Sequence, residues 1–79
     1  MTRNELIEKI DNGSDIMFDV SGRHFTIVTW LDEGIGIGEQ HKNEPLKVFE
    51  TVEDLISKFK VGDKTLEMLS DKIVITQYS

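Results

Sequence analysis

Two runs of alternating apolar and polar residues, joined by a Ser-Gly pair at positions 21 and 22, restrict the fold of this chain most strongly. A period of two is typical of a strand that buries one face. If the Ser-Gly pair forms a two-residue turn, Phe18 lies opposite Phe25 and Ile16 lies opposite Ile27. Both strands then present the same apolar face, and the sequence predicts an antiparallel hairpin.

A third strand is expected to follow a second turn at residues 32–34, where a glycine supplies the left-handed conformation that a three-residue turn needs. The strand itself begins Ile-Gly-Ile-Gly. In this register Leu31 lies opposite Ile35, and Trp30 lies opposite Gly36. An aromatic ring over a cross-strand glycine restores packing that the glycine lacks, so this arrangement gives Trp30 a structural role.

Helix signals occupy both ends of the chain. A Thr-x-x-Glu capping box predicts a helix over residues 2–11. A second helix is predicted over residues 51–61, where apolar residues recur at i, i+3, i+4 and i+7, and Gly62 is expected to end it. Leu66 and Leu69 are then expected to lie on a short helix of one or two turns.

Residues 46–49 are expected to be a short strand or an extended lead-in, and residues 72–77 a C-terminal strand. We therefore predict a single α+β domain over residues 1–79: a helix, an antiparallel β-meander, a second helix, a short helix and a C-terminal strand. So short a chain leaves no room for a second domain. The helices are expected to pack on one face of the meander. The predicted core consists of Leu6, Ile7, Ile10, Ile16, Phe18, Phe25, Ile27, Leu31, Ile37, Leu55, Ile56 and Phe59.

The charge balance narrows the class of partner. Fifteen Asp and Glu against nine Lys and Arg give a net charge of −6, which disfavours direct binding to nucleic acid or to an anionic membrane. The N-terminal residues lack the apolar run of a secretory signal, and no stretch is apolar enough to span a bilayer, so a cytoplasmic protein is expected. The absence of Ala and the high content of Ile and Lys are typical of a Gram-positive bacterium or its phage.

The sequence contains few residues in patterns that would support catalysis or the binding of a metal or cofactor. The chain has no Cys, and its carboxylates match no calcium-binding loop. His24 is expected to face Asp19 across the hairpin, which resembles half of a catalytic pair. A surface ion pair between the two strands accounts for it better. We expect a non-catalytic protein with neither metal nor cofactor, and a small hydrolase that uses His24 and Asp19 is the less favoured alternative.

Two sets of side chains are candidates for binding a protein partner. Six carboxylates are expected on strand ends, turns and the long loop, where they either keep the protein soluble or mimic the phosphates of a nucleic acid in a basic groove. These are Asp15, Asp19, Asp32, Glu33, Glu39 and Glu44. Met17, Val28 and Trp30 share the sheet face opposite the core. They either pack under the C-terminal segment or form an exposed contact patch.

Part of the chain resembles a known family. The sequence Asn-Glu-Leu-Ile-Glu-Lys-Ile at residues 4–10, followed by Asp-Ile-Met-Phe-Asp-Val-Ser-Gly at residues 15–22, is similar to the opening of small acidic anti-CRISPR proteins from Gram-positive prophages. Those proteins inhibit Cas9. Residues 49–59 and 64–69 resemble the C-terminal half of small uncharacterised proteins of Gram-positive bacteria and their prophages. The resemblance implies a phage accessory protein that acts by stoichiometric protein binding.

The functional expectation is therefore an acidic protein-binding module of the kind that phages and other mobile elements carry. In its sharpest version the protein is a DNA mimic that inhibits Cas9, and its partner is a protein with a basic nucleic-acid groove. The alternative is a homodimer that pairs through the strand edge at residues 46–49, which carries a single charge to deter pairing.

Overall fold

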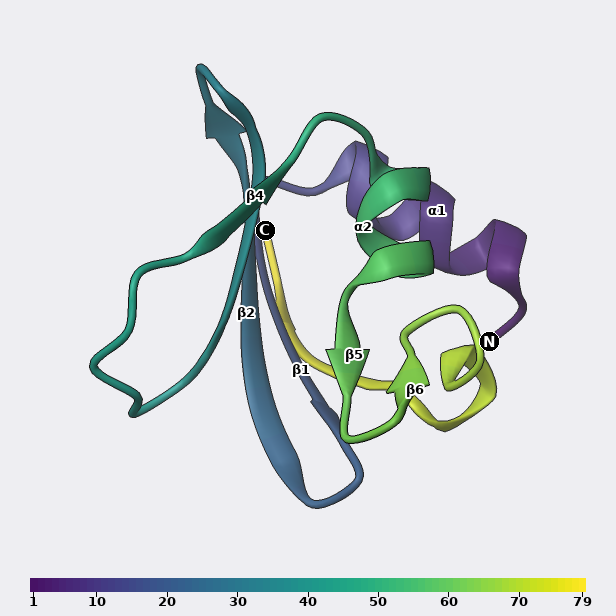
Figure 1. Ribbon diagram of the computed structural model, residues 1–79. Coiled ribbons are helices and arrows are strands. Elements are labelled where there is room, and N and C mark those ends of the chain that lie inside the picture. Colours follow the sequence, from purple (N-terminus) through teal and green to yellow (C-terminus); the bar gives the residue numbers. More distant parts are fainter.

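Seven strands and two α-helices make up the chain, and five of the strands form one sheet (Figure 1). The sheet is antiparallel throughout, with strand order β4-β3-β2-β1-β7. The predicted α+β class is confirmed. In the computed structural model, which describes residues 1–79, the elements are α1 (Arg3–Asn12), β1 (Asp15–Val20), β2 (Arg23–Leu31), β3 (Gly34–Glu39), β4 (Lys47–Phe49), α2 (Val52–Lys58), β5 (Lys60–Val61), β6 (Lys64–Thr65), the 3-10 helix η1 (Ser70–Lys72) and β7 (Val74–Tyr78).

The predicted hairpin is the centre of this sheet. Phe18 lies opposite Phe25, and Ile16 lies opposite Ile27, as the alternating pattern requires. The turn residues Ser21 and Gly22 both have positive φ angles, 54° and 74°, which is the conformation of a type I′ two-residue turn. The predicted register of β1 and β2 is therefore confirmed.

The register between β2 and β3 differs from the prediction. A bulge lies between Val28 and Leu31, so Leu31 pairs with Gly34 and Val28 pairs with Gly36. The extra residue reverses the alternation at the end of β2. Trp30 therefore does not lie opposite Gly36, and the predicted pairing was wrong.

The same bulge also changes the position of Leu31. The bulge turns its side chain away from the core, and a Cβ added to Gly36 would meet Leu31 Cδ1 at 2.8 Å. Leu31 accordingly lies on the sheet face opposite the core and is only half-buried. Its predicted place in the core was wrong.

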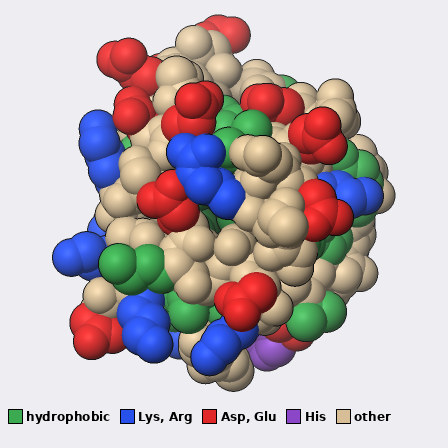
Figure 2. Space-filling model, turned by 90° about the vertical axis from the view of Figure 1, so that its right-hand side faces the viewer, with side chains coloured by type: hydrophobic (Ala, Val, Ile, Leu, Met, Phe, Trp, Pro, Cys, Tyr) green, Lys and Arg blue, Asp and Glu red, His purple; other side chains and the backbone are tan.

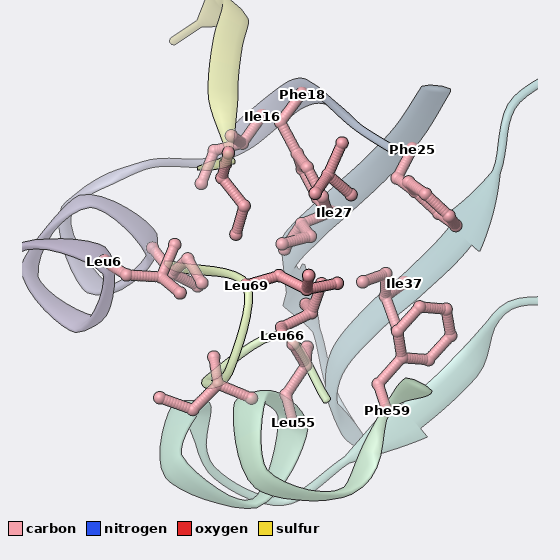
Figure 3. Packing of buried hydrophobic residues seen from close by; sticks show 14 of the residues in the cluster. Leu6, Ile16, Phe18, Phe25, Ile27, Ile37, Leu55, Phe59, Leu66 and Leu69 are labelled. Carbon is pink, nitrogen blue, oxygen red and sulfur yellow. The ribbon is translucent and has the colours of Figure 1, made fainter. Parts of the chain in front are cut away.

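Both helices and the β5–β6 hairpin lie on one side of the sheet and enclose the core between them (Figure 1). Figure 3 shows side chains from the sheet, the helices and the β6–η1 segment converging there. The Phe25 ring stacks on Phe18 with centroids 5.4 Å apart and meets the edge of Phe59 at 5.8 Å. The buried cluster consists of Leu6, Ile10, Ile16, Phe18, Val20, Phe25, Ile27, Ile37, Val52, Leu55, Ile56, Phe59, Val61, Leu66, Leu69 and Ile73. Ile7, predicted in the core, is partly buried against this cluster.

The helix starts agree with their capping signals. Thr2 accepts a hydrogen bond from the Glu5 backbone N–H, and the Glu5 side chain accepts one from the Thr2 backbone N–H, which completes the predicted capping box. The Thr51 side chain accepts from the Asp54 backbone N–H at the start of α2. Polar side chains thus satisfy backbone donors that have no partner within the helix.

The end of α2 comes earlier than predicted. The helix ends at Lys58, and Gly62 lies in the turn of the β5–β6 hairpin with a φ of 69°. Phe59 adopts extended backbone angles, which direct its ring towards Phe25 in the core. Burying Phe59 therefore takes the chain out of the helix, and Leu66 and Leu69 reach the core from a turn rather than from the predicted short helix.

The C-terminal strand was predicted, but its partner was not. β7 pairs antiparallel with β1, on the side of β1 away from β2, and its register shifts between Met17 and Phe18. Ile73 is buried and Ile75 packs partly against the core, so both lie on the core side. The last strand therefore forms one edge of the sheet.

Truncation of the central core residues provides a test of this packing. We expect Phe18→Ala to lower the free energy of unfolding by about 3–5 kcal/mol and Leu55→Ala by about 2–5 kcal/mol, because each leaves a cavity among buried side chains. Met68, which is 68% exposed, is the matched control, and Met68→Ala should change the stability by less than about 0.5 kcal/mol. Urea denaturation followed by circular dichroism measures all three. Similar losses for Met68 and Phe18 would contradict the assignment of the core.

Candidate partner-binding site

No helix lies over the face of the sheet opposite α1 and α2, and only the β3–β4 connection reaches out on that side (Figure 1). One row of residues crosses this outer face by direct strand pairing: Val48 lies opposite Gly36, Gly36 opposite Val28, and Val28 opposite Asp15. An antiparallel sheet commonly leaves one face to solvent, but that face then carries mostly polar side chains. The apolar residues of this row are therefore candidates for a contact surface.

An apolar patch surrounds this row. Gly36 and Gly38 have no side chains, and Leu46 fills the space that they leave: a Cβ on Gly38 would meet Leu46 Cδ2 at 2.7 Å. Leu31 and Val28 also approach the position of a Cβ on Gly36. Trp30 belongs to the same face because its indole bonds to Asp15, which lies opposite Val28. The outer patch, as we name it, consists of Val28, Trp30, Leu31, Leu46 and Val48.

Exposure within the outer patch is concentrated in three side chains. Trp30 is 64% exposed, Val48 is 44% exposed and Leu46 is 41% exposed, whereas Val28 is buried beneath its neighbours. Exposed aromatic side chains on a rigid surface are typical anchors of protein interfaces. Val28 and Leu31 thus provide the base of the patch, and Trp30 is its most accessible part.

Trp30 is held in place by a hydrogen bond. Its indole Nε1 donates to Asp15 Oδ1 at 3.0 Å. The end of β2 is fixed close by, where the Thr29 backbone N–H and hydroxyl donate to the Ser14 and Gly13 carbonyls. A side chain that is already oriented loses less entropy when a partner binds. Trp30 is therefore both exposed and preorganised.

The three side chains predicted as apolar contacts, Met17, Val28 and Trp30, differ in how far they are exposed. Val28 is buried, Met17 is half-buried and Trp30 is exposed. The C-terminal segment covers none of them, because β7 pairs with the edge of β1 and does not cross the sheet. Of the two alternatives, packing under the C-terminal segment does not occur, and only Trp30 of the three is largely accessible.

Carboxylates gather at the end of the sheet next to Trp30. The β2–β3 turn, the β4–α2 connection and the α1–β1 connection meet there: a Cβ on Gly34 would contact the backbone of Phe49 and Glu50, and Thr29 bonds to Gly13. Residues 11–15, 30–34 and 49–54 contain no Lys or Arg. The acidic end, as we name it, consists of Asp11, Asp15, Asp32, Glu33, Glu50, Glu53 and Asp54. Figure 2 shows acidic side chains without basic ones at the top of the molecule and both signs mixed below.

The six predicted acidic residues do not form one site. Asp15, Asp32 and Glu33 belong to the acidic end, whereas Asp19, Glu39 and Glu44 lie towards the other end of the sheet or in the β3–β4 connection. Two of the latter are paired: Asp19 Oδ1 lies 2.6 Å from His24 Nδ1, and Glu39 accepts two hydrogen bonds from Arg23 at 2.6 and 2.9 Å. The cationic Arg23 offsets the charge of Glu39 in the field that a partner meets.

The predicted contact between Asp19 and His24 is present. The side chains are 39% and 57% exposed, and neither lines one of the two surface pockets. An exposed pair of this kind matches the cross-strand surface pair that the register predicted. No group of three or more His, Asp or Glu side chains is placed to hold a metal ion, and no helix is both long and apolar enough to cross a membrane.

Part of the candidate site was not recognised in the sequence. Leu46 and Val48 were assigned only to a short edge segment, and Glu50 and Glu53 were assigned no role. The alternating glycines of β3 were a usable signal, because two glycines on one strand face leave room for a side chain from elsewhere. Which side chain fills that room depends on how the chain returns after the β3–β4 connection.

The fold and the site together define an α+β protein with a one-sided sheet, whose open face carries an apolar patch beside an acidic end. Comparison with protein-family models, with curated proteins and with solved structures finds no match.

The ion pair between Arg23 and Glu39 can be tested through the pKa of the Glu39 carboxyl. The hydrogen bonds from Arg23 lower the pKa of the Glu39 carboxyl below its ordinary value of 4.5. A lowered folded-state pKa contributes stability above the unfolded-state value, and that contribution is lost as the pH falls through the folded-state pKa. We expect Arg23→Gln to raise the pKa of Glu39, measured by NMR of the side-chain carboxyl groups.

Glu5 is an internal control for that titration. Its pKa is also lowered, but the cause is the hydrogen bonds with Thr2 in the capping box. Arg23→Gln should leave the pKa of Glu5 unchanged. An unchanged pKa of Glu39 in this variant would contradict the assigned cause.

Proposed function

We propose that this protein is a non-catalytic binding module that acts on a partner protein with a basic, nucleic-acid-binding surface. One observation carries the proposal: the most exposed aromatic side chain, Trp30, lies on the outer patch and is hydrogen-bonded to Asp15 of the acidic end. Apolar anchor and negative charge therefore form one continuous surface.

Electrostatics supports a cationic partner. Of the seven carboxylates of the acidic end, Asp54 has an ion-pair partner, Lys58 at 3.5 Å, and the other six have none. The whole chain carries a net charge of −6. Such a field attracts a basic surface and speeds the encounter, and it repels nucleic acid itself.

We assign most of the binding free energy to the apolar part of the site. Exposed ion pairs contribute little to affinity, whereas a buried aromatic anchor at the centre of an interface commonly dominates it. Trp30 is the one tryptophan of the chain. We therefore assign steering to the acidic end and most of the binding free energy to the outer patch.

Mimicry of nucleic acid is the specific form of the proposal. Carboxylates on a small rigid domain can occupy a groove whose basic residues otherwise bind phosphates, and the two ligands then compete. The resemblance of residues 4–10 and 15–22 to anti-CRISPR proteins makes Cas9 the first partner to test. In this form the protein is an accessory factor of a phage or another mobile element and acts stoichiometrically.

The proposal is tested with purified guide-loaded Cas9 and, in parallel, with partners captured from a Gram-positive lysate. Binding to the partner should weaken steeply as salt rises and should compete with the partner's DNA. Asp32→Asn with Glu33→Gln should reduce the affinity and flatten the salt dependence. Trp30→Ala should reduce the affinity by about 30-fold or more, as loss of an aromatic anchor does. Fluorescence anisotropy with labelled DNA as competitor measures these effects.

A matched pair of substitutions controls for net charge. Asp63→Asn with Asp71→Asn also removes two negative charges, but at exposed positions outside the acidic end. This double variant should leave the affinity nearly unchanged. If both double variants weaken binding equally, only net charge matters and the acidic end is not a site. If affinity ignores salt and both double variants but is lost in folded Trp30→Ala, the contact is apolar and mimicry is wrong.

A further inference from the structure

The two edges of the sheet differ in how well they are protected. β7 is an edge strand of five residues, and no Lys, Arg, Asp, Glu or Pro occurs from residue 73 to residue 79. Val74 is 61% exposed and Tyr78 is 40% exposed. An edge strand offers unpaired backbone N–H and C=O groups, and proteins usually protect it with charge, proline, a bulge or short length. β7 has a bulge but neither charge nor proline.

The opposite edge is better protected. β4 has only three residues and begins with the charged Lys47, and Glu50 follows directly after it. Three residues offer few backbone groups for pairing. β7 is therefore the edge at which another strand is more easily added, although β4 was the edge singled out from the sequence.

We propose that β7 pairs antiparallel with β7 of a second copy of this chain. Antiparallel pairing of a strand with its own copy is a two-fold rotation about an axis perpendicular to the sheet. The two five-stranded sheets then join into one sheet of ten strands, with the helices of both copies on the same side. No charged residue of β7 meets its own copy across the axis, because β7 contains none.

Two copies that each carry a net charge of −6 repel each other, and the same two-fold rotation reduces this repulsion. It exchanges the two ends of the sheet, so the acidic ends of the two copies lie at opposite ends of the joined sheet. Charges of both signs lie near β7. Lys9 lies over the Tyr78 ring at 4.9 Å and Lys72 precedes the strand, while Asp19 pairs with Val74 and Asp15 bonds to Ser79. The acidic ends are thus kept apart in the dimer, and the paired strands themselves carry no charged side chain.

The joined sheet leaves the proposed binding surface free. The outer patch comes from β2, β4 and the β3–β4 connection, away from β7, so each copy keeps its own patch and both patches face the same side. The bulge in β7 shortens the regular pairing, so we expect a reversible dimer with a Kd on the order of 100 µM, as befits a small interface. This inference does not rest on the proposed function.

Sedimentation equilibrium of the purified chain from about 10 µM to about 1 mM tests the proposal. The wild type should change from monomer to dimer over this range. Val74→Lys with Thr76→Lys, both at exposed positions of β7, should raise the Kd at least about tenfold, because it places like charges along the paired edge. Val48→Lys with Met68→Lys adds the same charge away from β7 and should change the Kd by less than about twofold.

Hydrogen exchange measured by NMR identifies the edge directly. Backbone amides of β7 should become more protected as the protein concentration rises, while those of β4 stay unchanged. Circular dichroism melts confirm that each double variant remains folded. A monomer throughout the concentration range overturns the proposal. So does a dimer that survives the β7 substitutions, or one that the Val48→Lys and Met68→Lys control abolishes instead.

Discussion

The amount of helix available to cover the sheet determines the rest of this structure. α1 has ten residues and α2 has seven, and together with the β5–β6 hairpin they cover one face of a five-stranded sheet. A core of 16 buried residues fills the space between these two layers. No helix covers the second face of the sheet, and Trp30 therefore stays largely exposed there.

The open face is partly covered by a side chain of the β3–β4 connection. Gly36 and Gly38 create the space that Leu46 fills, so part of the apolar surface is removed from water without a second layer. Trp30 is not treated in this way. It stays largely exposed, and its indole is fixed by Asp15 at the margin of the acidic end. Leu46 covers the two glycines but is itself 41% exposed, and Trp30 is 64% exposed. Together they leave an exposed apolar surface of the kind that marks interaction sites.

Local signals predicted the structure where one segment determines its own conformation. The β1–β2 register followed from alternation and a Ser-Gly turn, and both helix starts followed from caps. The predictions were wrong where the conformation of one segment depends on contacts with a distant one. The bulge before Leu31 depends on how β3 returns, and the early end of α2 depends on Phe59 reaching Phe25. The acidic end could not be found from sequence alone, because its three segments meet only through β4 and α1.

Tryptophan fluorescence tests the central claim, an uncovered outer face, most directly, because Trp30 is the one tryptophan in the chain. The emission of the free, dilute protein and its quenching by acrylamide can be compared with those of the urea-unfolded chain. The account predicts emission typical of a solvent-exposed indole and quenching only moderately slower than in the unfolded state. Strongly blue-shifted emission with little quenching in the free protein would show that the outer face is covered, and it would contradict the account.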